Sequence, residues 1–168
     1  RYIVTPDKHF PFEDKKAIKA LCNIIEELRP DGYIDLGDTG EWASVSRWKW
    51  KNKPKPHLEY YMPAIIKDVD DVNAGMDIID EALDKANVKD KHFIQGNHEL
   101  WLDHFVESAP YLPQFACKEA IKIDERGYTY HRAGELLTIG DMSFYHGHNY
   151  GGMHHAAAHA KNFKCNIM

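Results

Sequence analysis

The sequence has 168 residues, of which 43% are hydrophobic, and a formal net charge of −5. This length buries one substantial core and fits a single domain over residues 1–168 better than two domains. No apolar run approaches the roughly 20 residues that cross a bilayer, and the N-terminus lacks the layout of a signal peptide, so we expect a cytoplasmic protein without membrane contact.

The first third of the sequence alternates between strand and helix patterns. An apolar run predicts a strand over 2–5, helical spacing of apolar residues predicts a helix over 14–28, and a second strand is expected over 33–36. A strand, helix, strand unit indicates parallel pairing of the two strands. Residues 42–61 lose this periodicity and are predicted to form an insertion loop.

The remaining two thirds predict further helices and strands. Helical spacing returns over 65–86, a short strand is expected over 92–95, and the sequence is mostly helical to about residue 122. Three short strands separated by glycine turns should form a second, more antiparallel sheet: 128–132, 136–139 and 142–145. An alanine-rich helix over 154–163 and the opening of another strand at 165–168 complete an α/β pattern.

Polar residues gather at four points where an apolar strand is predicted to end. The clusters are Asp7-Lys8-His9, Gly37-Asp38, Gly96-Asn97-His98-Glu99 and His146-Gly147-His148. Ligands collect at the carboxyl ends of strands in α/β sheets, so the four loops are expected to meet. Carboxylates, imidazoles and an amide oxygen suit divalent Mn, Fe or Zn. We expect Asp38 to bridge two such ions, which is an arrangement that supports in-line phosphoryl displacement.

In this order the four clusters resemble the signature of the calcineurin-like metallophosphoesterases, over almost the whole chain. The resemblance implies a sandwich of two mixed β-sheets flanked by helices, with two divalent metal ions at the strand ends. By matching position, it implies that Asp7 and His9 hold the first ion, that Asn97 and His146 hold the second, and that Asp38 touches both. The implied activity is hydrolysis of a phosphomonoester or phosphodiester by a hydroxide that the two metals activate.

The resemblance gives two further residues a catalytic part. His98 would not be a ligand but would protonate the leaving oxygen or stabilise its charge, which is general-acid work. Glu41 stands where a related subgroup carries an acidic partner for that histidine, so its carboxylate would orient the imidazole. The substrate could be a nucleotide, a nucleic acid or a phosphoprotein, and the oligomeric state is left open.

The sequence departs from the family pattern in two places. The family ends its metal set with a Gly-His-x-His motif, which would begin where this sequence ends at Met168. Since the sequence also begins with Arg1, we interpret it as a C-terminally truncated part of a longer protein. Trp42 stands where the protein serine/threonine phosphatases carry an arginine that grips phosphate, which argues against a phosphoprotein substrate.

Two features keep alternative interpretations open. The insertion at 42–61 interleaves aromatic and basic residues, which is typical of a single-stranded nucleic-acid groove but also of an amphipathic flap or an oligomer contact. A nucleic-acid-binding module or a non-catalytic scaffold with the same fold is therefore the alternative function. His154, His155 and His159 are expected on a helix that flanks the active site. His155 and His159, one helical turn apart, could instead clasp a metal, and contact of one of the three with the substrate is left open.

Overall fold

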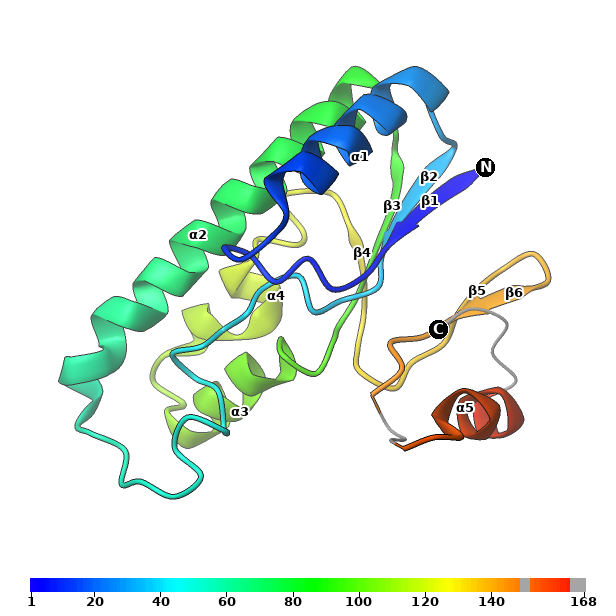
Figure 1. The fold of residues 1–168 in the computed structure, drawn as a ribbon. Helices are drawn as coiled ribbons and strands as arrows, with labels where there is room; N and C mark the ends of the chain where they lie inside the picture. Colours follow the sequence, from blue (N-terminus) through cyan, green and yellow to red (C-terminus); the bar gives the residue numbers. More distant parts are fainter. Residues whose placement is uncertain (149–151, 164–168) are drawn as a thin grey trace.

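The computed structural model describes residues 1–148 and 152–163 and is built on a parallel sheet of four strands, shown in Figure 1. The strands lie in the order β1 (Tyr2–Thr5), β2 (Gly32–Asp35), β3 (Asp90–Ile94) and β4 (Thr129–His131). All of β2 is buried, as expected for a strand inside a parallel sheet that is covered on both faces. The predicted parallel pairing of the first two strands is confirmed.

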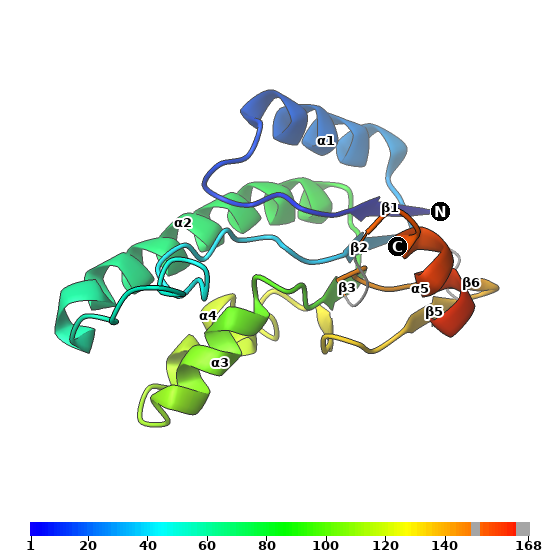
Figure 2. The ribbon, with the colours of Figure 1, turned by 60° about the horizontal axis from the view of Figure 1, so that its bottom comes forward.

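Helices α1 (Lys15–Leu28) and α2 (Leu58–Lys85) run together along one face of the sheet (Figures 1 and 2). The side chain of Asp14 caps α1 by accepting hydrogen bonds from the backbone N–H groups of the first turn. The buried apolar residues of α2 recur at helical spacing and enter the main core: Ile65, Val72, Met76, Ile79 and Leu83. These two helices therefore seal one side of the sheet.

The second long helix begins earlier than the sequence pattern predicts. We expected an insertion loop over 42–61, but α2 already begins at Leu58, so the loop covers only 42–57. Pro63 lies inside the first turns of α2 and obscures the helical pattern in the sequence. The early start is stabilised by Tyr61, whose ring contacts Phe105 with 6.4 Å between the centroids.

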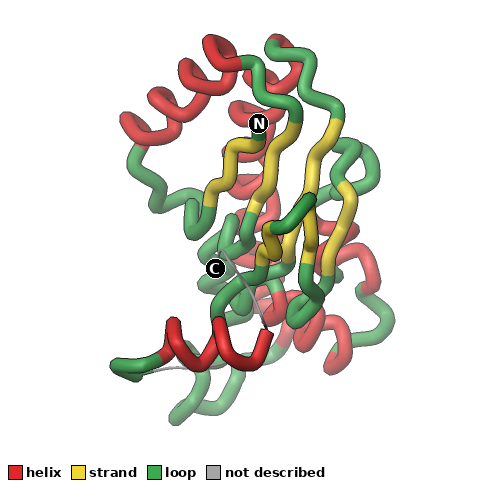
Figure 3. The backbone as a smooth tube through the Cα atoms, turned by 90° about the vertical axis from the view of Figure 1, so that its right-hand side faces the viewer, coloured by secondary structure: helices red, strands yellow, loops and turns green. Residues whose placement is uncertain are grey.

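The opposite face of the sheet is covered by an antiparallel hairpin of β5 (Leu137–Ile139) and β6 (Met142–Phe144). Neighbouring residues of a strand point to opposite faces. Accordingly, Tyr33 of β2 enters the main core on the helix side, whereas Ile34 enters a smaller cluster with residues of the hairpin. Viewed in Figures 2 and 3, the chain forms a helix layer, a sheet and a small hairpin layer.

The strand predicted over 128–132 belongs to the main sheet and not to the second sheet. It forms β4, which pairs with β3 in parallel, so only the two later strands make an antiparallel pair. The reason is tertiary packing, because Phe93 and Tyr130 lie opposite each other and stack with 6.2 Å between ring centroids. The α/β class is confirmed, with a wholly parallel larger sheet in the described part of the chain.

The stretch between β3 and β4 is helical, as predicted. It contains α3 (Leu100–Ser108), a 3₁₀ turn at Pro113–Phe115 and α4 (Cys117–Ala120), and it extends the main core. The last helix, α5 (His155–Phe163), follows the hairpin, and the strand predicted at 165–168 lies outside the described residues. Within residues 1–148 and 152–163, no helix is both long and apolar enough to cross a membrane.

One buried carboxylate ties together the loops that leave β2 and β3. Glu99 is fully buried, and its two oxygens accept five N–H hydrogen bonds of 2.8 to 3.1 Å. The donors are the backbone N–H groups of Asp38, Thr39, Gly40 and Gly96 and the indole Nε1 of Trp42. Burial and the charge of Asp38 raise the pKa of Glu99, whereas the donated N–H groups act in the opposite direction.

Two glycines allow the loops after β2 and β3 to approach each other so closely that the Glu99 carboxylate reaches both loops. Gly37 has a φ of +94°, and a Cβ atom there would lie 2.5 Å from the backbone nitrogen of Gly96. A Cβ atom on Gly96 would in turn lie 2.3 Å from Oδ1 of Asp38. Side chains at either position would push the loops apart, so glycine is required at both.

Glu99→Gln is expected to lower the free energy of unfolding by about 3 kcal/mol, because the glutamine NH₂ group would face backbone N–H donors that now need an acceptor. Urea unfolding of the full chain measures this loss. Glu107→Gln, an exposed change on α3, is the matched control and should stay within about 0.5 kcal/mol. Equal stability of the two variants would contradict the role of Glu99.

Candidate metal centre

The predicted site residues all lie in loops that leave the carboxyl ends of strands. Asp7 and His9 follow β1, Asp38 follows β2, Asn97 and His98 follow β3, and His146 follows the hairpin strand β6. The parallel strands direct three of these loops to one edge of the sheet, and the hairpin brings the fourth (Figure 3). The structure thus places the predicted residues where ligand sites of α/β sheets occur.

The loops after β1 and β2 continue side by side beyond the strands. The backbone nitrogen of Asp7 donates to the carbonyl of Gly37 at 3.0 Å, and that of His9 donates to the carbonyl of Asp38 at 3.0 Å. Asp7, His9 and Asp38 have φ angles of 51°, 49° and 49°, in the left-handed region that non-glycine residues seldom adopt. The paired loops hold these three residues in a strained geometry, which is common at functional sites.

A buried ion pair supports this paired segment from below. Lys8 Nζ lies 2.7 Å from Asp35 Oδ1, and both side chains are almost completely buried. The same oxygen accepts hydrogen bonds from the hydroxyl of Thr39 at 2.8 Å and the backbone nitrogen of Gly37 at 3.1 Å. Sequence reasoning did not assign Lys8 or Asp35 a part in the site. The signal was an aspartate inside the apolar run at 33–36, because a buried charge needs a partner.

Asp38 is the residue that the two predicted halves of the site share. On one side, ligand atoms of Asp7, His9 and Asp38 lie within 4.8 Å of one another. On the other side, Asp38 Oδ1 lies 3.5 Å from His146 Nε2, and the same nitrogen lies 3.2 Å from Asn97 Oδ1. All five predicted ligands therefore converge, with the largely buried carboxylate of Asp38 between the two groups.

The imidazole of His146 is held in a defined orientation. Its Nδ1 donates to the backbone carbonyl of Leu36 at 2.7 Å, which directs Nε2 toward Asp38 and Asn97. Burial lowers the pKa of His146, but the hydrogen bond and charge of Asp38 outweigh burial, so the pKa lies above its ordinary value. Burial likewise raises the pKa of Asp38, yet His146 and the backbone N–H of His98 bring it below its usual range.

The donor set of this centre suits divalent cations. Three carboxylates, those of Asp7, Asp38 and Glu41, gather around His9 and His98, and a bound cation would balance this concentration of negative charge. His9 Nδ1 is buried and has no aligned hydrogen bond from the described residues, although Glu41 Oε2 lies 3.0 Å away. Oxygen and imidazole nitrogen ligands together match Mn, Fe or Zn.

His98 and Glu41 contact each other, but not in the way the sequence predicted. His98 Nδ1 donates to the backbone carbonyl of Glu41 at 3.0 Å, whereas the Glu41 carboxylate lies 3.8 Å from that nitrogen. The carboxylate is closer to His9, at 3.0 Å from Nδ1. The His98 ring stacks on Trp101 with 4.1 Å between centroids, and Nε2 lies 4.0 Å from Asp38 Oδ2. Glu41 therefore orients His98 through its backbone.

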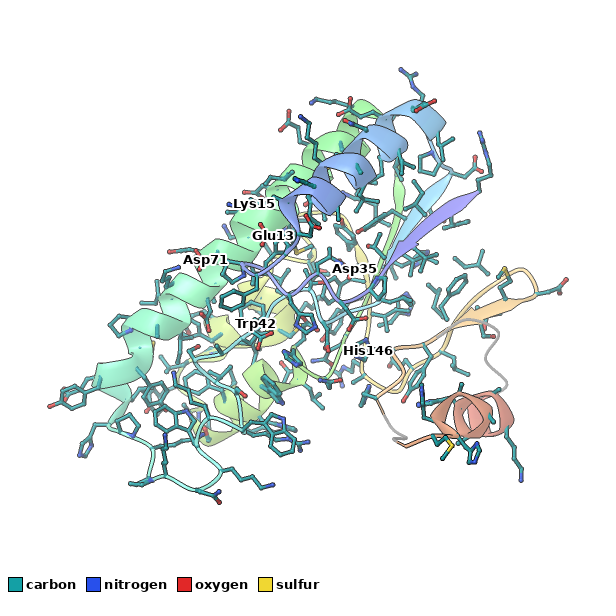
Figure 4. The ribbon with its side chains drawn as sticks, viewed as in Figure 1. Glu13, Lys15, Asp35, Trp42, Asp71 and His146 are labelled. Carbon is teal, nitrogen blue, oxygen red and sulfur yellow. The ribbon has the colours of Figure 1, made fainter. Side chains whose placement is uncertain are left out.

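A cavity of about 390 Å³ opens beside the centre and is lined by Asp7, Asp38, Asn97 and His146, together with His148 and residues of α5. Figure 4 shows His146 on the segment after the hairpin, facing the region where Asp35 and Trp42 lie. The predicted flanking helix is present, and His155 and His159 both line the cavity. Their rings are perpendicular, with 6.4 Å between centroids.

The comparisons with known proteins cover only part of this chain. It is 38% identical over 48 residues to the Gene 54 protein of Mycobacterium phage D29 and, to the same extent, to the Gene 54 protein of Mycobacterium phage L5. The matched stretch is 29% of this chain and 19% of each phage protein, so the chain spans about a fifth of their length. No protein-family model matches the chain, and no solved structure matches it.

Proposed function

We propose that this chain is a metal-dependent phosphoesterase of the calcineurin-like kind, which hydrolyses a phosphomonoester or a phosphodiester. The proposal depends mainly on the position of Asp38. This residue lies near Asp7 and His9 on one side and near His146, which contacts Asn97, on the other, so that four separate loops contribute to the centre. A sheet with helices on one face and a hairpin on the other supports the sandwich that this proposal requires. An isolated metal-binding turn would need neither feature.

Each residue of the centre has a part in this proposal. Asp7 and His9 would hold one divalent ion and Asn97 and His146 a second, and Asp38 would serve as a ligand shared by the two groups. A pair of such ions supplies Lewis acidity and neutralises charge on the phosphate oxygens. The protein contributes fixed ligand positions, because the loops that carry these residues are cross-linked by backbone hydrogen bonds and by the buried carboxylate of Glu99.

His98 is the general acid in this proposal. The Glu41 carbonyl holds its Nδ1, and Trp101 supports the ring face, so Nε2 is the atom that gives a proton to the leaving oxygen. Trp42 does not face the substrate, since its indole is buried and donates to Glu99. Protein phosphatases carry a phosphate-gripping arginine at this position, whereas Trp42 here has a structural part. This difference favours a substrate other than a phosphoprotein.

The alternative is a non-catalytic scaffold with the same fold. It is less well supported, because a scaffold needs neither the left-handed backbone at Asp7, His9 and Asp38 nor an oriented His98. Incubation of the full chain with Mn, Fe, Zn or Mg and either a chromogenic phosphomonoester or its diester analogue separates the two functions. Metal-dependent release of the chromophore is expected from the enzyme, and no release with any metal supports the scaffold.

Asp38→Asn is expected to abolish turnover and to weaken binding of both metal ions, because the shared ligand loses its charge. The fold should persist, since an amide oxygen can still accept the hydrogen bond that His98 N donates at 2.9 Å. Metal content after dialysis and turnover of the chromogenic ester are the measurements. Asp70→Asn, an exposed change on α2, is the control, and normal turnover by the Asp38 variant would refute the assignment.

His98→Ala is expected to leave metal content unchanged and to lower kcat by about 10²- to 10⁴-fold, which is the usual contribution of a general acid. His104→Ala removes an exposed histidine from α3 and should leave both quantities unchanged. Loss of metal from the His98 variant would show instead that this residue is a ligand.

Metal binding is expected to release protons near neutral pH. Asp38 raises the pKa of His146 above its ordinary value in the metal-free chain, so the imidazole stays protonated to higher pH, and a metal on Nε2 must displace that proton. The affinity of the chain for the metal should therefore rise with pH up to the raised pKa of His146 and level off above it. Calorimetric titration in two buffers of different ionisation enthalpy measures the release. Equal heats in both buffers at neutral pH would contradict it.

A further inference from the structure

The loop before α2 carries a dense positive charge that no acidic residue balances. Between residues 47 and 55, a segment called the basic loop below, five exposed cations occur and no acidic residue does: Arg47, Lys49, Lys51, Lys53 and Lys55. None of the five forms an ion pair within residues 1–148 and 152–163, whereas Lys67, Lys85 and Lys118 elsewhere pair with carboxylates. In a chain of net charge −5, this concentration of positive charge is local and accessible.

The tryptophans of this region divide into anchors and an exposed ring. Trp42 is buried, and Trp50 packs toward Tyr61 with 6.2 Å between ring centroids, so these two attach the loop to the domain. Trp48 is 58% exposed, and in the described part of the chain it is not among the buried or partly buried residues of the main core. The interpretation as an amphipathic flap accounts for Trp42 and Trp50, but it leaves Trp48 unexplained.

Cations surround the exposed ring of Trp48. The guanidinium of Arg47 and Nζ of Lys51 each lie 4.8 Å from its centroid, and the three side chains line a hollow of about 360 Å³. Cation–π attraction holds these two side chains against the indole, and the ring is still largely exposed to solvent. A nucleobase that stacks on this ring would displace one long side chain, whose charge then meets the adjoining phosphate.

We propose that the basic loop binds single-stranded nucleic acid, with a base stacked on Trp48 and the backbone phosphates held by the surrounding cations. Aromatic rings that stack bases, set among cations that contact phosphates, are the elements with which proteins bind single strands. A duplex does not offer its base faces to such a ring, so single strands are favoured over duplexes.

The basic loop is joined directly to the proposed metal centre. Glu41, whose carboxylate lies 3.0 Å from His9 Nδ1, is followed by Trp42, which is fastened to Glu99 by a hydrogen bond of 3.1 Å. The seven peptide bonds from Glu41 to Trp48 span at most about 25 Å. A strand of several nucleotides held on Trp48 therefore reaches the centre, and a nucleic-acid phosphodiester becomes the substrate class. This second step rests on the proposed phosphoesterase function, whereas strand binding does not.

The test measures binding apart from catalysis. Fluorescence anisotropy of the full chain in chelator, with labelled DNA and RNA single strands of about 12 nucleotides, reports affinity without hydrolysis. Trp48→Ala should weaken binding about 10-fold, as loss of one stacked base does. Ile24→Ala, which removes an exposed apolar side chain from α1, should not change it. The DNA and RNA arms show which sugar is preferred, and a duplex of equal length should bind more weakly than either.

The salt dependence tests the cations. Lys49→Ala combined with Lys51→Ala should reduce the slope of log K against log salt by about 1.4, since each phosphate contact contributes about 0.7 on a single strand. Lys16→Ala with Lys19→Ala, on the exposed face of α1, removes the same charge and should leave the slope unchanged. Equal slopes for the two double variants would overturn the proposal.

The remaining outcomes separate this inference from the phosphoesterase proposal. No strand binding, or a concentration-dependent dimer that Trp48→Ala dissociates in sedimentation, overturns the nucleic-acid assignment even if the chromogenic diester is hydrolysed. Strand binding that depends on Trp48, without turnover of any ester, supports this assignment and contradicts the phosphoesterase proposal alone.

Discussion

The hydrogen bonds to the buried carboxylate of Glu99 are the constraint on which the candidate site depends. This one side chain accepts N–H groups from the loop after β2 and from the loop after β3, so the two loops cannot move independently. The backbone N–H of Asp38 is itself bound to Glu99. Asn97 directly follows Gly96, whose N–H is also bound to Glu99. The geometry of the ligands therefore follows from a residue that is not a ligand.

The same arrangement explains why the centre tolerates so much negative charge. Backbone N–H groups point at Glu99, and Lys8 neutralises Asp35, so these two buried carboxylates are satisfied by the protein. Asp7 and Asp38 are different, because their oxygens lie within 4.8 Å of each other and of a His9 nitrogen and both residues line the cavity. Glu41 belongs to a second such group with His9 and His98. The carboxylates of the candidate metal centre are thus different from the two that hold the loops together.

The charge of the surface beside the centre has the opposite sign. The basic loop begins a few residues after the segment that carries Asp38 and Glu41, and between the two Trp42 donates a hydrogen bond to Glu99. An anionic polymer held on the loop would lie next to cations bound by the carboxylates. The constraint that positions the ligands also fixes the base of the basic loop, and this links the two proposed binding surfaces physically.

The sequence by itself determined the strands β1 to β3, the first helix and the residues that converge, because apolar periodicity and polar clusters at strand ends are local patterns. Only the tertiary structure decided that β4 joins the parallel sheet, that α2 begins at Leu58 and that the Glu41 carboxylate turns to His9. It also decided the part of Glu99. These outcomes depend on contacts between residues far apart in the chain, such as Phe93 with Tyr130 and Tyr61 with Phe105, and no local pattern records such contacts.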